Sequence, residues 1–149
     1  MLPEQPDPAD KGRSAVQEFR WPVRVYYEDT DSGGVVYYAN YLKFMERART
    51  EWLRSIGFEQ DRLLADDGIL FAVTEIELRY LSPARFNDAL TVTARVVEQR
   101  RASLRFAQTV LNGDRALCEG RIQIACLDSA GFRPRPIPNA LITEISDVD

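Results

Sequence analysis

The chain has 149 residues, the size of one domain, and a domain of this length buries roughly 70% of the surface that its unfolded chain exposes. Hydrophobic residues make up 45% and charged residues 28% of the sequence, which argues against a mainly disordered chain. The formal net charge is -4, so the protein has no overall basic field to attract nucleic acid. We therefore expect a folded domain with no nucleic-acid partner.

The sequence contains no histidine. This excludes the Ser-His-Asp and Cys-His arrangements and every metal site that needs an imidazole ligand. Two cysteines, Cys118 and Cys126, are too few for a four-cysteine zinc site, so we expect neither a metal nor another cofactor. If both lie on one strand they are roughly 26 Å apart, too far for a disulfide. We interpret them as buried, reduced thiols of a cytoplasmic protein.

Prolines and charged residues fill the first part of the chain, MLPEQPDPADKGRSAVQ, where a signal peptide would need an apolar core. No stretch approaches the roughly 20 apolar residues of a membrane-spanning helix. We therefore expect a protein that is neither exported nor membrane-spanning, with residues 1–20 as a flexible arm. We expect the core domain over residues 21–138 and a tail, stiffened by the prolines before it, over residues 139–149.

The first predicted elements are a strand and a long helix. Valine and tyrosine residues predict a strand over Val23–Glu28, after Pro22 and before the turn-forming EDTDSGG. From about Tyr38 to Gly57 the period changes to that of a helix. The apolar residues at helical spacing are Tyr41, Leu42, Phe44, Met45, Ala48, Trp52, Leu53 and Ile56. A second, short helix is predicted over Gln60–Ala65.

The second half of the chain alternates with a period of two, which predicts strands. One face of the first of these strands is expected to comprise Leu70, Ala72, Thr74, Ile76, Leu78 and Tyr80. Further strands are predicted around 90–96, 104–110 and 122–126, the last two joined by a hairpin at Asn112-Gly113. We expect an α+β fold, an antiparallel sheet of about five strands wrapped around one long helix. Because the strands contain more apolar residues than one helix covers, we also expect at least a dimer.

An acidic, glycine-containing loop precedes the long helix. Its candidate residues are Glu28, Asp29, Asp31, Gly33 and Gly34. The first turn of a helix leaves about four backbone N–H groups unpaired, so a thioester carbonyl placed there would be polarised. An ionised aspartate beside it could attack the carbonyl or activate water. The competing interpretation is structural, since such loops are common turns and Tyr37, Tyr38 and Tyr41 are more often packing residues than substrate contacts.

The segment YYEDTDSGGVVYYANYLKFMERARTEWL resembles the signature of hotdog-fold acyl-CoA thioesterases, in particular the 4-hydroxybenzoyl-CoA thioesterase group and its bacterial Tol-Pal-associated members. The resemblance extends from about Trp21 to Ile137, and the order strand, helix, meander agrees with the hotdog fold. It implies hydrolysis of short-chain or aromatic acyl-CoA to a free acid and CoA, without a cofactor. It also implies that Asp31 is the catalytic carboxylate, as nucleophile or general base, and that Tyr27 lines the pocket.

The branches of that family differ at the position of Tyr38. The Tol-Pal-associated branch usually carries a histidine there that is thought to assist catalysis, whereas the 4-hydroxybenzoyl-CoA branch carries a tyrosine whose backbone N–H polarises the thioester carbonyl. A backbone donor survives replacement of the side chain, so Tyr38 stays a catalytic candidate. The expected substrate-binding residues on the loop before it are Gly34, Val35 and Val36. Glu46 on the helix is a weaker candidate for the base, since its neighbour Arg49 suggests an ordinary salt bridge.

Coenzyme A carries phosphates, which arginines bind well. The candidates are Arg100 and Arg101, followed by Arg133 and Arg135, and the alternative is that both clusters are simply solvated. The resemblance implies a site made from both protomers of a homodimer, or of a homotetramer built as a dimer of dimers. A competing function is a weakly active or inactive binding module for acyl carrier protein, lipid-synthesis enzymes or Tol-Pal-linked envelope machinery. A dehydratase-like activity is disfavoured, because those enzymes typically use a histidine.

Overall fold

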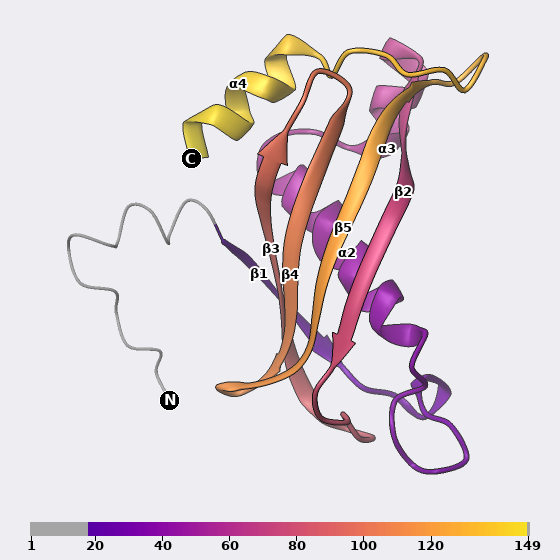
Figure 1. Ribbon diagram of the computed structural model, residues 1–149, viewed down its shortest axis with the longest axis vertical. Helices are drawn as coiled ribbons and strands as arrows, with labels where there is room; N and C mark the ends of the chain where they lie inside the picture. Colours follow the sequence, from indigo (N-terminus) through magenta and orange to yellow (C-terminus); the bar gives the residue numbers. More distant parts are fainter. Residues whose placement is uncertain (1–17, 149) are drawn as a thin grey trace, which may run out of the picture.

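The computed structural model describes residues 18–148, which form one antiparallel sheet with the strand order β1-β3-β4-β5-β2. The strands are β1 (Phe19–Arg24), β2 (Ile69–Tyr80), β3 (Ala89–Gln99), β4 (Ser103–Asn112) and β5 (Arg115–Asp128). The helices are α2 (Asn40–Ser55), α3 (Gln60–Arg62) and α4 (Asn139–Val148), with two irregular turns, η1 (Tyr27–Asp29) and η2 (Leu63–Asp67). Figure 1 shows α2 running diagonally across one face of the sheet. The predicted α+β fold, five strands around one long helix, is confirmed.

Helix α2 packs its apolar stripe onto the sheet, as the spacing of its residues predicts. Its buried residues are Asn40, Tyr41, Phe44, Met45, Ala48, Trp52 and Leu53. Helix and sheet approach each other so closely at Gly120 of β5 that a Cβ there would lie 2.7 Å from Leu78 Cδ2 and 3.1 Å from Met45 Sδ. A larger residue at this position would therefore force the ends of the Leu78 and Met45 side chains to move.

Strand β1 begins and ends earlier than the predicted Val23–Glu28. Pro22 lies inside the strand, paired with Thr91 of β3, and not in front of it. A proline is tolerated there because β1 is an edge strand, so its missing N–H interrupts no second ladder. Phe19 already belongs to the sheet, and residues 1–17 of the expected arm lie outside the described part of the chain.

The grouping of residues predicted for one face of β2 is correct only in the second half of the strand. The register against β5 shifts directly after Val73, where the strand contains a β-bulge. One extra residue reverses the alternation, because side chains change face at every position. Phe71 and Val73, and not Leu70 and Ala72, therefore share the helix-facing side of the sheet with Ile76.

The C-terminal segment, expected as a tail, contains helix α4. Leu141 and Ile145, one helical turn apart, are fully buried, and the Leu141 N–H donates to the Pro138 carbonyl at the start of the helix. Figure 1 shows α4 at the end of the sheet where the β3–β4 hairpin lies, and the Ile137 N–H donates to the Arg101 carbonyl there. Within residues 18–148, none of the helices is both long and apolar enough to cross a bilayer.

Candidate active site

The loop that contains Asp31 is a tight turn closed by its own backbone. The Asp31 N–H donates to the Val35 carbonyl at 2.9 Å, and the Gly34 N–H donates to the Asp31 carbonyl at 3.0 Å. Gly34 has a φ of +84°, a conformation that glycine adopts without strain. The Asp31 side chain takes part in the turn, because its Oδ1 accepts the Gly33 N–H at 2.8 Å. Asp31 is exposed in the single chain, and its Oδ2 has no partner among the described residues.

Two hydrogen bonds on one carbonyl tie this acidic loop to helix α2. The carbonyl oxygen of Asp29 accepts the Tyr37 N–H and the Asn40 side-chain Nδ2, both at 2.9 Å. Asp29 also closes the turn before it, since its Oδ2 accepts the Tyr26 N–H at 2.8 Å. Asp29 is thus a structural acid, whereas Asn40 is a site residue that the sequence analysis missed. Its signal in the sequence is a polar side chain at the head of an apolar helical stripe.

The start of α2 carries the free amides that an oxyanion site requires. The helix begins at Asn40 and not at the predicted Tyr38, because the Asn40 N–H donates to the Tyr37 carbonyl in a tight turn. The N–H groups of Tyr38 and Ala39 have no acceptor within residues 18–148. They lie at the positive end of the helix dipole. On the loop before them, the amides of Gly34, Val36 and Tyr37 are already used in internal hydrogen bonds.

The tyrosines around the loop have different surroundings. Tyr41 is a packing residue, 3% exposed, and its Oη accepts the Ala84 N–H at 3.1 Å. Tyr27 is 75% exposed and stacks face to face on Phe86, with ring centres 3.9 Å apart. Tyr38 is 62% exposed. The buried side chain of Val36, by contrast, belongs to the core and offers no surface to a substrate.

Comparison with known proteins identifies the family of this chain. Residues 33–119, more than half of the chain, match the family model of the thioesterase superfamily. The chain belongs to the thioesterase superfamily. It is 43% identical to the acyl-CoA thioester hydrolase YbgC of Escherichia coli over 127 residues, which cover 85% of this chain and 94% of the relative.

Two further relatives extend the comparison. The chain is 42% identical to the acyl-CoA thioesterase YbgC of Haemophilus influenzae over 120 residues, 80% of this chain and 88% of that one. The crystal structure of a probable thioesterase from Bartonella henselae superimposes with a TM-score of 0.78 at 34% identity, covering 81% of this chain and 99% of that one. These relatives confirm the family resemblance and the hotdog fold.

Within one thioesterase chain, Arg100 and Arg101 lie far from Asp31. Strand β3 starts beside the loop, where Arg85 pairs with Val35, and ends at the hairpin that carries the two arginines. Its 11 residues span about 36 Å. A single chain therefore does not bring these arginines and Asp31 to one ligand-sized site.

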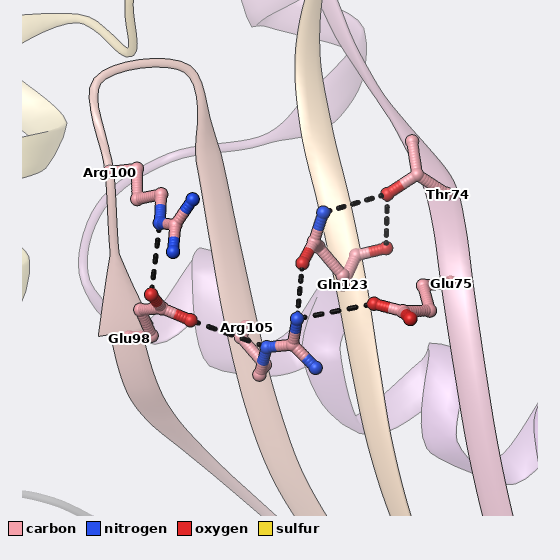
Figure 2. Close-up of polar contacts among 6 residues, drawn as sticks. All are labelled: Thr74, Glu75, Glu98, Arg100, Arg105 and Gln123. Atoms are coloured by element: carbon pink, nitrogen blue, oxygen red, sulfur yellow. Dashed lines mark hydrogen bonds and ion pairs between the residues drawn. The ribbon is translucent and has the colours of Figure 1, made fainter.

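The candidate arginines also differ in whether they already form hydrogen bonds or ion pairs with other residues of the chain. Arg100 Nε donates to Glu98 Oε2 at 2.9 Å. Figure 2 shows this pair continuing through Arg105, which contacts Glu98 and Glu75, so Arg100 belongs to a charged network across the sheet. Arg135 is a structural residue, because its Nη1 donates to the Asp67 carbonyl at 2.7 Å. The Arg101 side chain is exposed and forms no ion pair with the described residues.

A groove runs along α2 on the side of β2. A hollow of ≈ 80 Å³ and a neighbouring one of ≈ 200 Å³ share Glu46, Arg49 and Val73. The apolar walls of the first include Trp52, Leu53, Phe71, Leu104, Phe106 and Ile124. The second extends to Leu42, two residues after the start of α2, so the groove leads toward the Asp31 loop. The thioesterase chain thus has two adjoining hollows along α2, and the second ends within one helical turn of the free amides.

The expected salt bridge between Glu46 and Arg49 is not formed within the described residues. Arg49 Nη1 donates instead to Gln108 Oε1 at 2.9 Å, and burial lowers the pKa of Arg49. Gln108 is 1% exposed, and its Nε2 donates to the carbonyls of Met45 and Thr93. Glu46 remains exposed at the edge of the groove without this partner.

Proposed function

We propose that this chain hydrolyses acyl-CoA thioesters to a free acid and CoA. The relatives named above carry this activity in their names, and they match most of this chain. The observation that carries the proposal is the juxtaposition of the exposed Asp31 loop with the unpaired amides of Tyr38 and Ala39. A carboxylate and two oriented N–H donors are what acyl transfer needs when histidine is absent.

In this mechanism the thioester carbonyl oxygen binds the Tyr38 and Ala39 amides. Either the Asp31 carboxylate attacks the carbonyl carbon, or it removes a proton from a water molecule that attacks. The negative charge that develops on the oxygen is stabilised by the two donors, each worth roughly 3 kcal/mol. The C–S bond then breaks and CoA leaves as a thiolate that takes up a proton. On the nucleophilic path, water next hydrolyses the acyl–Asp31 anhydride.

The active unit in this proposal is a homodimer formed through β2. This strand is one edge of the sheet, and Val73, Ile76 and Tyr80 on its helix-facing side are each more than 40% exposed. A second copy related by a two-fold axis along this edge covers these side chains. It also places the Arg101 end of one copy on the same side as Asp31 of the other. A tetramer is then a dimer of such dimers.

The acyl group in this proposal enters the groove between α2 and β2. The small first hollow and its aromatic walls favour short-chain or aromatic acyl groups. The exposed rings of Tyr27 and Tyr38 and the backbone of Gly34 and Val35 border the entrance. Arg101, followed by Arg100, binds the phosphates of CoA. The two buried free thiols, Cys118 and Cys126, fit a reducing cytoplasmic location.

A second candidate function is a binding module for acyl carrier protein or for Tol-Pal-linked envelope proteins. The absence of histidine favours it, because Tyr38 occupies the position of the histidine that is thought to assist catalysis in the Tol-Pal-associated branch. In that case the chain holds acyl groups with little turnover. The two functions differ in whether the purified protein releases thiol.

The test is thiol release from a panel of short-chain, long-chain and aromatic acyl-CoA. We expect release by the wild type and a loss of about 10²–10⁴-fold in Asp31→Asn, the range for a positioned base. Asp114→Asn, in the exposed β4–β5 turn, is the matched control and should retain activity. Absence of release with every acyl-CoA, or full activity in Asp31→Asn with folding retained, would contradict the proposal.

A further inference from the structure

The carbonyl group of Tyr38 does not join the hydrogen-bond ladder of helix α2. The Leu42 N–H, which reaches this carbonyl in a regular α-helix, donates to the Ala39 carbonyl at 3.1 Å instead. The Tyr38 carbonyl oxygen accepts a hydrogen bond from Tyr80 Oη at 2.9 Å. A residue at the end of β2, 42 positions along the chain, therefore holds the carbonyl that precedes the helix.

The direction of this carbonyl determines where the next amide points. The Tyr38 C=O and the Ala39 N–H belong to one planar peptide unit and point in opposite directions in its trans form. The Ala39 N–H, like the Tyr38 N–H, has no acceptor within the described residues. A hydrogen bond to the carbonyl also polarises the peptide unit and strengthens its N–H as a donor. The Tyr80 hydroxyl thus both orients and strengthens this amide.

The phenol of Tyr80 is itself held in a fixed position. Its ring lies edge-on against Tyr41 and Tyr38, with ring centres 5.6 Å and 6.4 Å away. Tyr41 is a rigid support, because it is buried and its hydroxyl accepts the Ala84 N–H. Desolvation raises the pKa of Tyr80, which keeps its hydroxyl protonated and able to donate.

We propose that Tyr80 is a positioning residue whose hydroxyl orients the Tyr38–Ala39 peptide, so that the Ala39 N–H joins the Tyr38 N–H in binding the thioester oxyanion. The inference rests on the proposed hydrolysis, and it adds Ala39 to the donors expected from the sequence. Tyr80 acts through the peptide and does not touch the substrate. Because full charge develops on the oxygen only during reaction, loss of the hydroxyl lowers kcat more than it changes KM.

The first test compares Tyr80→Phe with Tyr26→Phe in the full chain. Each variant removes one hydroxyl and keeps the ring, and Tyr26 is 60% exposed on the segment before the loop. We expect Tyr80→Phe to lower kcat by about tenfold with KM within about twofold of the wild type. Its melting temperature should stay within a few degrees of that of Tyr26→Phe, whose kcat stays unchanged. An unchanged kcat in Tyr80→Phe, or a change in KM alone, would overturn the proposal.

The second test does not depend on turnover and separates this inference from the proposed function. It measures the Ala39 amide proton by NMR in the wild type and in both variants. Loss of the hydrogen bond to the Tyr38 carbonyl should shift the Ala39 resonance upfield in Tyr80→Phe and leave it in place in Tyr26→Phe. An Ala39 resonance that does not respond to Tyr80→Phe excludes the positioning role, whether or not the wild type hydrolyses acyl-CoA.

Discussion

The side-chain amide of Asn40 donates a hydrogen bond to the carbonyl oxygen of Asp29 at 2.9 Å. The same oxygen accepts the Tyr37 N–H, also at 2.9 Å. Asn40 is only 9% exposed and is the first residue of α2. A single carbonyl therefore fixes the acidic loop relative to the helix start, and with it the position of Asp31 relative to the free amides.

Replacing Asn40 with alanine should affect both stability and activity. The variant leaves the partly buried Asp29 carbonyl with one donor fewer, which costs about 1–2 kcal/mol in the free energy of unfolding. It also loosens the loop, so we expect kcat/KM for acyl-CoA to fall by about tenfold. Urea denaturation and thiol release measure the two effects. Asn40→Asp keeps the shape but lacks the donor, so wild-type behaviour of either variant would contradict this role.

A side chain at Gly120 should lower the stability of the fold. In Gly120→Ala the new methyl group would lie 2.7 Å from Leu78 Cδ2 and 3.1 Å from Met45 Sδ, so the ends of these two side chains must move. We expect a loss of about 1–3 kcal/mol in the free energy of unfolding, the usual range for overpacking. Gly131→Ala is the control, because its Cβ would meet no atom closer than 3.6 Å. Equal denaturation midpoints for the two variants would show that the contact relaxes without cost.

The stability of the protein should fall at alkaline pH through Cys118. Burial raises the pKa of this thiol from 9.0 to about 11, so the folded state holds the proton more tightly than the unfolded state. Its contribution to stability is complete below pH 9 and is lost as pH rises to about 11, to a total of about 2–3 kcal/mol. Cys118→Ala should flatten this part of the stability curve measured by urea denaturation. An identical pH dependence in wild type and variant would contradict the shift.

The elements that local patterns determine were predictable from the sequence. The apolar period of α2 predicts both the helix and its buried face, and Asn112-Gly113 predicts the hairpin between β4 and β5. The β-bulge after Val73 was not predictable, because its position depends on how β2 pairs with β5 and leaves no mark in the alternation of the strand itself. Helix α4 was missed because its two buried residues follow a proline-rich stretch that suggests a tail.

The candidate site, too, was predictable only where the local sequence determines it. The motif around Asp31 and the helix start identify the loop, because they lie within one continuous segment. Asn40 and Tyr80 act through hydrogen bonds to carbonyls 11 and 42 positions away, and no local pattern reveals such partners. The placement of Arg101 also depends on the fold, since the length of β3 separates it from the loop.

Arg101→Ala should weaken substrate binding without slowing the chemical step. Phosphate contacts are remote from the reacting bond, so we expect KM for acyl-CoA to rise several-fold at unchanged kcat, with a smaller effect at high salt. Arg100→Ala should change KM less, because Arg100 already pairs with Glu98. The same acyl group on N-acetylcysteamine, which lacks the phosphates of CoA, provides the control. If KM rises equally for this substrate, Arg101 does not act through the phosphates.

A charge at Ile76 should separate the two copies of the proposed dimer and remove activity together with assembly. Ile76 is 43% exposed in the single chain and lies on the edge strand β2, so Ile76→Asp would bury an unpaired carboxylate in the proposed interface. We expect sedimentation to show a monomer and kcat/KM to fall with it, because Arg101 then no longer reaches the Asp31 of a second copy. Phe132→Asp, the same type of change at a position 63% exposed in the loop after β5, should leave both unchanged. A dimeric Ile76→Asp variant with full activity would place the interface elsewhere, and an active monomer would show that one chain holds the complete site.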